Sequence, residues 1–242
     1  ALRPRPGSPT TVPTALNSLL AALLDRSRVG WLPVRVRSGP LQGAWWTLYP
    51  HSAYWRGHFE PEVQAAVAQW QPAAGACAGD LGAHFGYYTL ALARAVGATG
   101  AIMALEPDAK SFRRLQRHIA LNRAHQVRTF LAAASGKTGR HFLVQSHGAG
   151  STTSHLPYQG EVVRDDTPGQ WIETVALDEL REKERMALPS FVKIDVEGHG
   201  ATTLLGASET LAMSRPNILM SFHSPEESSG TCLLYTSDAA DE

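Results

Sequence analysis

The sequence has little cysteine, no net charge and no long apolar run, and each shortage excludes a class of protein. Only Cys77 and Cys232 occur among 242 residues, so no disulfide framework is predicted and a reducing compartment is the natural interpretation. Lysine plus arginine and aspartate plus glutamate both number 22. This balance argues against broad electrostatic binding of nucleic acid or of an anionic membrane. We therefore expect a cytoplasmic protein that binds no nucleic acid.

No segment reaches the ~18 apolar residues of a membrane span, so no stable membrane insertion is expected. The longest apolar run, residues 16–24, has leucines at helical spacing and favours a short amphipathic helix over a secretion signal. The hydrophobic content of 43% is typical of a globular protein rather than a disordered one. The length predicts one sizeable domain, alone or with an N-terminal extension.

From residue 75 onward, strand and helix patterns alternate and predict an α/β fold. Candidate strands lie at 76–81, 101–106, 127–133, 190–196 and 217–223, and candidate helices at 85–97, 108–122 and 200–213. Strands separated by helices need crossover connections, so we predict a mostly parallel sheet with helices on both faces. The interval 136–175 breaks this rhythm with glycine, serine and threonine. It favours a mobile loop flanked by short strands at 141–144 and 171–175.

These patterns divide the chain into four segments. Residues 1–33 are expected to form an arm and a short helix, and residues 34–74 a hairpin at 34–48 and a helix at 60–70. Residues 75–231 form the α/β domain. Residues 232–242 match neither periodicity and resemble the translation of a sequencing-library adapter, so we expect them to be non-native.

The stretch GDLGAHFGYY, residues 79–88, predicts a ligand-binding turn between a strand and a helix. Its order is D-x-G-x-H-x-G, from Asp80, Gly82, His84 and Gly86, and not the dinucleotide fingerprint G-x-G-x-x-G. Asp80 would repel a pyrophosphate but could accept from an ammonium group. A cofactor with an amino-acid end, such as S-adenosylmethionine, fits this turn better than a nicotinamide dinucleotide.

Both glycines and a second acid extend this interpretation. Gly82 would let backbone approach the ligand, and Gly86 would let the following helix pack close to the strand. Glu106 ends the next strand, 24 residues after Gly82, and is placed to accept from ribose hydroxyls. The alternative for Glu106 is a solvated acid at a strand end. Asp108 is more simply the N-cap of the next helix.

Several segments together resemble the FkbM family of S-adenosylmethionine-dependent methyltransferases. They are GDLGAHFGYYTLALA, ALEPD, LN at 121–122, VALDEL at 175–180, FVKIDVEGHGATTLLGA at 191–207 and YWRGHFEPE at 54–62. The resemblance covers roughly residues 34–224. It implies a Rossmann-like class I methyltransferase sheet with strand order 3-2-1-4-5, whose closing C-terminal strand pair would be missing here.

The resemblance also implies methyl transfer, usually to an oxygen of a natural product, sugar or lipid, so the expected partner is a small-molecule or glycan acceptor. The cofactor-binding residues it implies are Asp80, Gly82, Ala83, His84, Gly86, Glu106 and Pro107. Tyr54 and Trp55 are candidates to cover the cofactor. The family commonly has Asn at position 84, and both Asn and His tolerate left-handed backbone, so His84 is interpreted first as a turn residue. The family often has acids where Gly200 and Ser221 stand here.

Candidates for deprotonating an acceptor hydroxyl are Asp195, Glu197 and His223, near the ends of two apolar strands. Alternatively, Lys193 and Asp195 only pair with each other, and Glu197 caps the next helix. The histidine spacings form no compact ligand set, so no metal is predicted. Two other functions stay open: a non-catalytic domain that keeps the fold, and a nicotinamide-dependent oxidoreductase.

Overall fold

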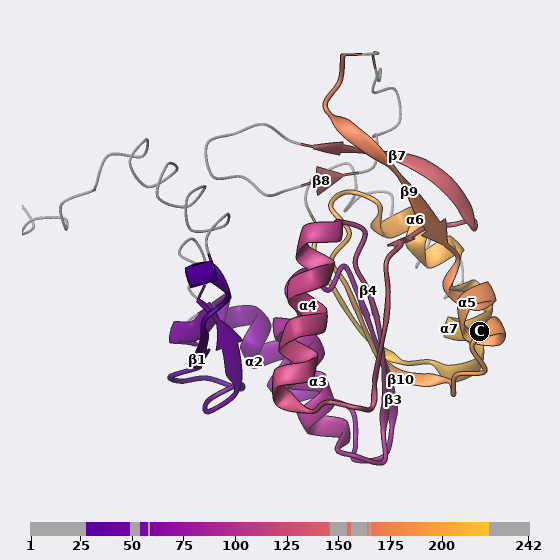
Figure 1. Cartoon of the computed structure of the whole chain (residues 1–242). Coiled ribbons are helices and arrows are strands. Elements are labelled where there is room, and N and C mark those ends of the chain that lie inside the picture. The colour runs from indigo at the N-terminus through magenta and orange to yellow at the C-terminus, as the bar shows by residue number, and fades with distance from the viewer. Residues whose placement is uncertain are drawn as a thin grey trace, which may run out of the picture.

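A computed structural model describes residues 28–48, 54–57, 59–145, 154–155, 164 and 166–222 of the chain (Figure 1). Three sequence predictions fall outside these residues: the helix at 16–24, the role of His223 and the nature of residues 232–242. Within the described part, no helix has the length and apolar character needed to cross a lipid bilayer.

A parallel sheet of five strands forms the centre of the molecule, in the order β11-β10-β3-β4-β5. The strands are β3 (Cys77–Leu81), β4 (Ala101–Leu105), β5 (Val127–Phe130), β10 (Pro189–Ile194) and β11 (Asn217–Met220). Read from β5 and numbered along the chain, this is the order 3-2-1-4-5 of a class I methyltransferase sheet, as predicted. The description of the chain stops at residue 222, just past β11, so the missing closing pair stays a prediction.

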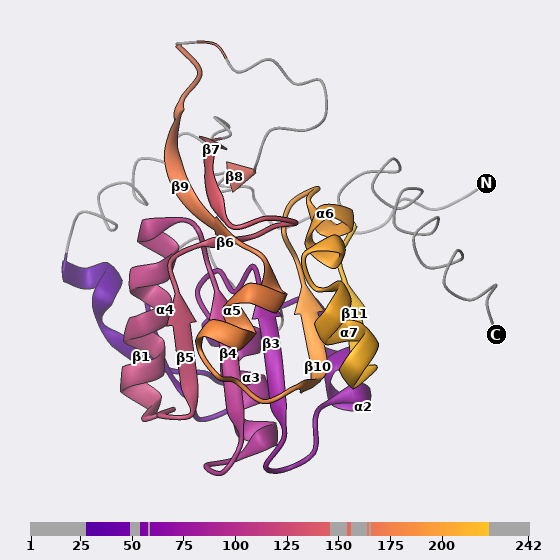
Figure 2. The ribbon, with the colours of Figure 1, turned by 90° about the vertical axis from the view of Figure 1, so that its right-hand side faces the viewer.

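Helices cover both faces of this sheet, which confirms the predicted layers (Figure 2). They are α2 (Pro61–Trp70), α3 (Tyr87–Val96) and α4 (Ala109–Asn122) on one face, and α5 (Leu177–Lys183), α6 (Gly200–Leu205) and α7 (Ser208–Ser214) on the other. Each face has its own core because strand side chains alternate. Ala78 and Ile102 point into the core with α3, whereas Cys77 and Met103 point into the core with α5.

The predicted helix at 200–213 is broken into α6 and α7. The break lies at Gly206, where a Cβ atom would lie 2.1 Å from the carbonyl oxygen of Ser135. The chain passes so close to that segment that only glycine fits. The sequence does not reveal this neighbour, which lies far away along the chain. The helix α5 was not predicted, although its sequence LDELREK has acids in the first turn and bases in the last turn.

A smaller mixed sheet stands above the carboxyl ends of the central strands (Figure 1). Its strands are β6 (Ala133–Ala134), β7 (Gly139–Gln145), β8 (Ser154–His155) and β9 (Gly169–Val175), in the order β6-β9-β7-β8. The short strands predicted at 141–144 and 171–175 are therefore the longer antiparallel pair β7 and β9. Leu143 and Ile172 are buried on one face of this pair, and Trp171, on the other face, is 62% exposed.

The N-terminal segment packs against α3 and α4. The predicted hairpin is confirmed as the antiparallel pair β1 (Pro33–Arg35) and β2 (Trp45–Thr47), flanked by the short 3-10 helices η1 (Arg28–Trp31) and η2 (Tyr54–Arg56). Trp46 is fully buried, with its ring stacked on His118 of α4 at a centroid distance of 3.6 Å. Trp46 and Tyr54 belong to the same core cluster as α3, so this segment is part of the folded body that holds the site.

Candidate active site

A cavity of about 290 Å³ opens at the carboxyl ends of the central strands. Ligands of open α/β sheets bind at this edge. The volume is near the lower end of the range for small-molecule sites, roughly 300–1,000 Å³. The lining residues are Tyr54, Phe59, Glu60, Gly82, Ala83, His84, Tyr87, Tyr88, Glu106, Pro107, Asp108, Ser111, Ala133, Ala134, Leu143, Lys193, Asp195, Val196, Glu197 and His199.

Most of the residues predicted for the site meet at this cavity. Those that line it are Gly82, Ala83, His84, Glu106, Pro107, Asp195 and Glu197. Asp80 and Gly86 are not among the lining residues, although both belong to the turn. His223 lies outside the described residues, so its predicted role stays a prediction.

Both glycines of the turn are in close contact with other parts of the protein. Gly82 also lines the cavity, so its predicted approach to a ligand stays a prediction. Gly82 has a φ of 84°, and a Cβ atom there would lie 1.9 Å from the carbonyl oxygen of Asp195. The end of β10 therefore excludes any side chain at position 82, before a ligand is considered. Gly86, with a φ of 86°, would place a Cβ atom 2.4 Å from Cδ1 of Leu115. Its close approach is thus to α4 and not, as predicted, to a strand.

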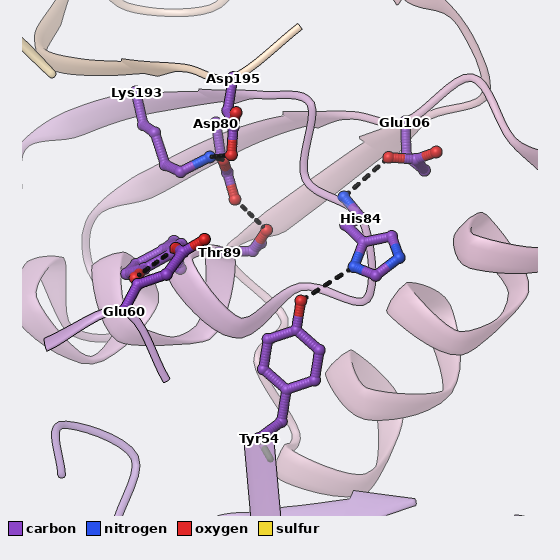
Figure 3. A network of polar contacts seen from close by, with 9 residues as sticks. Tyr54, Glu60, Asp80, His84, Thr89, Glu106, Lys193 and Asp195 are labelled. Atoms are coloured by element: carbon purple, nitrogen blue, oxygen red, sulfur yellow. Dashed lines mark hydrogen bonds and ion pairs between the residues drawn. The ribbon is translucent and has the colours of Figure 1, made fainter. Parts of the chain in front are cut away.

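His84 has a φ of 49°, which matches its interpretation as a left-handed turn residue. Its backbone N–H donates to Glu106 Oε2 over 2.7 Å, and its Nδ1 lies 3.0 Å from the hydroxyl of Tyr54 (Figure 3). Burial lowers the pKa of His84 to about 4 and raises that of Tyr54, so the imidazole is neutral and the phenol protonated. Either the phenol donates to Nδ1 or an Nδ1–H group donates to the phenol oxygen, according to the tautomer of His84.

Glu106 is buried at the end of β4, and its carboxylate is held by two backbone groups. Oε2 accepts from the N–H of His84, and Oε1 accepts from the N–H of Asp108 over 2.8 Å. Burial raises the pKa of Glu106 to about 8, against the opposing effect of these two bonds. A carboxylate has about four lone-pair sites, so two bonds leave it able to accept from a ligand's hydroxyls.

Asp108 caps α4, as predicted, because its Oδ1 accepts from the backbone N–H groups of Lys110 and Ser111. The N-cap of α6 is His199, so Glu197 does not hold the capping position that the alternative interpretation gave it. Glu197 instead lines the cavity with a left-handed φ of 47°.

A buried ion cluster lies beside the turn, between β3 and β10 (Figure 3). Lys193 Nζ lies 3.7 Å from Asp80 Oδ1 and 3.1 Å from Asp195 Oδ2. Asp80 is fully buried and also accepts from the hydroxyl of Thr89 over 2.5 Å. Burial opposes the charged form of Lys193, but Asp80 and Asp195 raise its pKa, so it remains an ammonium ion. The ammonium group that Asp80 meets in this structure is therefore that of Lys193. Lys193 also pairs with Asp195, as in the alternative interpretation, but not with Asp195 alone.

Sequence reasoning missed several lining residues. Tyr88 is in the first turn of α3. The start of a helix that follows a ligand-binding loop faces the ligand, so the position of Tyr88 in the sequence was a usable signal. Glu60 lies in the quoted segment YWRGHFEPE, but nothing in its spacing relates it to the turn. Leu143 lies in the short strand predicted at 141–144, but nothing in the sequence places that strand at the cavity. No group of His, Cys, Asp or Glu side chains in the described ranges is arranged to hold a metal ion.

Comparison with known proteins gives a family match and distant structural matches. A family model described as the methyltransferase FkbM domain matches residues 80–239, and so reaches into the segment 232–242. No curated protein sequence matches the chain. A crystal structure of methyltransferase FkbM from Methylobacillus flagellatus KT has 17% identity and a TM-score of 0.42, over 85% of this chain and 49% of that one.

Two further solved structures are similar to a comparable degree. An S-adenosylmethionine-dependent O-methyltransferase from Thermotoga maritima has 11% identity and a TM-score of 0.44, over 72% of this chain and 48% of that one. An O-methyltransferase from Bacillus cereus, in complex with S-adenosylhomocysteine, has 18% identity and a TM-score of 0.40, over 69% and 63%. The chain spans about half the length of the first two structures.

Proposed function

The chain belongs to the FkbM methyltransferase family, and from that membership we propose that it binds S-adenosylmethionine and transfers a methyl group to a hydroxyl oxygen. The proposed acceptor is a small molecule, a sugar or a lipid. The support comes from the order in which chemically different residues line the cavity.

Along the carboxyl edge of the sheet, the lining changes from charged to polar to apolar. At β10 it is charged, with Lys193 and Asp195, and after β4 it offers the acceptor Glu106. Beyond β5 it is apolar, with Ala133 of β6 and Leu143 of β7 from the smaller sheet. S-adenosylmethionine has the same order of groups: a charged amino-acid end, a ribose diol and a flat adenine. This match along one edge is the observation that carries the proposal.

The residues of the chain can account for the acceptor step. Bound S-adenosylmethionine would supply a methyl group activated by a sulfonium. An acceptor hydroxyl must lose its proton as it reacts, and Asp195 is placed to take that proton because its side chain is partly exposed at the cavity. Lys193 holds one oxygen of this carboxylate at 3.1 Å and so fixes its orientation. Holding donor and acceptor in line supplies several further kcal/mol by proximity.

The proposal is tested first by calorimetry with S-adenosylhomocysteine and NAD as separate ligands. We expect S-adenosylhomocysteine to bind and NAD to bind at least tenfold more weakly. Tighter binding of NAD would overturn the cofactor assignment. Transfer of labelled methyl groups to a panel of sugars, lipids and phenols then identifies the acceptor. If Asp195→Asn, still folded, transfers methyl groups as fast as the original protein, the proton-accepting role of Asp195 is refuted.

A further inference from the structure

Tyr54 reaches the turn from the N-terminal segment. It belongs to η2, its side chain is buried, and it lines the cavity. Its hydroxyl lies 3.0 Å from Nδ1 of His84 (Figure 3). A hydroxyl can hold the group that it contacts when its own ring is fixed. The ring of Tyr54 is fixed by packing among other aromatic side chains, those of Trp46, Phe59, Phe85 and Tyr87.

The backbone conformation of His84 needs such support. Gly82, His84 and Gly86 all have a positive φ, and of these three only His84 carries a side chain. A residue with a side chain is strained in this conformation and keeps it only where its surroundings hold it. The ring of His84 stacks on that of Phe85 at a centroid distance of 3.8 Å, and Nδ1 bonds to the hydroxyl of Tyr54. The bond to Tyr54 forms with either tautomer of His84, because either partner can donate.

The conformation of His84 matters at the cavity because its backbone N–H meets Glu106. This N–H donates to Oε2 over 2.7 Å, while Oε1 accepts from the N–H of Asp108. Asp108 is only two residues from Glu106 in the chain, whereas His84 belongs to the turn after another strand, β3. The orientation of the carboxylate therefore depends on where the turn places the N–H of His84. Through His84, hydrogen bonds connect Tyr54 to Glu106, and all three residues line the cavity.

We propose that Tyr54 is a positioning residue for the nucleoside end of the cofactor: through His84 it holds the turn so that Glu106 faces the ribose diol. The inference rests on the proposed function. It gives the N-terminal segment a specific part in ligand binding, beyond the covering role expected from the sequence. Tyr54 precedes residue 80, where the match to the FkbM domain begins. A ligand without the diol should not respond to the loss of the hydroxyl.

Calorimetry with two nucleosides tests this directly. 5′-Methylthioadenosine, a nucleoside thioether, carries the ribose diol, and its 2′,3′-dideoxy analogue lacks both hydroxyls. Tyr54→Phe removes the phenol hydroxyl and keeps the packed ring. We expect it to weaken binding of 5′-methylthioadenosine by about fivefold or more, and binding of the analogue by less than about twofold. The matched control is Thr210→Val, which removes a buried hydroxyl that accepts from Arg181 on the other face of the sheet, and it should affect neither ligand.

A double-mutant cycle tests whether Tyr54 acts through His84. His84→Gly removes the imidazole, and glycine suits the left-handed backbone. Adding Tyr54→Phe to His84→Gly should change binding of 5′-methylthioadenosine by less than about twofold, because the hydroxyl then has no imidazole to hold. Additive losses would show that the hydroxyl of Tyr54 acts on the ligand directly, and would overturn the positioning role. If Tyr54→Phe does not fold, His84→Gly takes its place, and it should weaken 5′-methylthioadenosine but not the analogue.

The outcomes separate the two proposals. Unchanged affinity in Tyr54→Phe, or equal weakening of both nucleosides, would overturn the role of Tyr54 and leave the proposed function standing. The same conclusion would follow if the original protein binds S-adenosylhomocysteine but does not prefer the nucleoside with the diol. Failure of the original protein to bind S-adenosylhomocysteine would overturn the proposed function and this inference with it.

Discussion

The raised pKa of Glu106 predicts that nucleoside binding strengthens with pH. Burial places this pKa at about 8, so Glu106 is mostly protonated at pH 6 and mostly ionised at pH 9. Only about 1% is ionised at pH 6 and about 90% at pH 9, a difference of roughly ninetyfold. In the proposed complex, the ionised form would accept from both ribose hydroxyls. A hydrogen bond to a charged group contributes ~1.5–3 kcal/mol, so affinity should rise at least about tenfold over this interval.

The assay is calorimetric titration of 5′-methylthioadenosine at pH 6, 7, 8 and 9. This ligand has no group that titrates in that range. The shifted pKa values of His84, at about 4, and Tyr87, at about 12, also lie outside it. Glu106→Gln should bind with the low affinity of the original protein at pH 6 and show a flat profile, whereas Glu62→Gln, which changes an exposed acid in the first turn of α2, should keep the slope. A flat profile in the original protein, or an unchanged slope in Glu106→Gln, would refute the reasoning.

The remaining predictions concern stability and catalysis. A group whose pKa is higher in the folded than in the unfolded state stabilises the fold at pH values below its unfolded-state pKa, which is near 4.5 for Glu106. This contribution to stability is lost as the pH rises to about 8. The melting temperature of the ligand-free protein should therefore fall more between pH 5 and 8 than that of Glu106→Gln; parallel melting curves would contradict this. Gly82→Ala should lower the free energy of unfolding in urea by at least ~2 kcal/mol more than Gly97→Ala does. Both glycines have a positive φ, but only at Gly82 would the new Cβ atom meet backbone, 1.9 Å from the carbonyl oxygen of Asp195. Equal losses would show that the contact with Asp195 relaxes. Asp195→Asn should lower methyl transfer by ~10²–10⁴ with S-adenosylhomocysteine binding within a few fold, and added chelator should have no effect; loss of activity with chelator would indicate a metal.

The strand order and the position of Glu106 at the cavity could be predicted because each depends on a local pattern. Asp80 and Glu106 each come at or just after an apolar strand, and parallel strands bring their carboxyl ends to one edge of the sheet. The reason for Gly82 could not be predicted, because the atom that it avoids belongs to Asp195 in another strand. The partner of Asp80 was misjudged for the same reason: the alternation in β10 puts Lys193 on the cavity side, but only the pairing of β10 with β3 places it beside Asp80.

Glu60 shows a different limit of sequence reasoning. An acid just before a proline at the start of a helix is ordinarily expected to cap the helix N-terminus. At Glu60 the backbone is left-handed and the side chain makes no capping hydrogen bond. The strands β7 and β9 were underestimated because glycine, serine and threonine lie between them. Their pairing depends on contacts across that interval rather than on the residues within it.

His118 connects the N-terminal hairpin to the turn at the cavity, and this connection has a consequence for hydrogen exchange. Its Nδ1 lies 2.7 Å from the carbonyl oxygen of Phe85, and its Nε2 accepts from the backbone N–H of Thr47 over 3.0 Å. Burial lowers the pKa of His118 to about 3, so one neutral imidazole donates to the turn and accepts from the hairpin. A ligand that rigidifies the turn should therefore slow deuterium uptake at the amide of Thr47, which is not among the residues that line the cavity. Through one ring, an amide in β2 becomes a reporter of events at the carboxyl edge of the sheet.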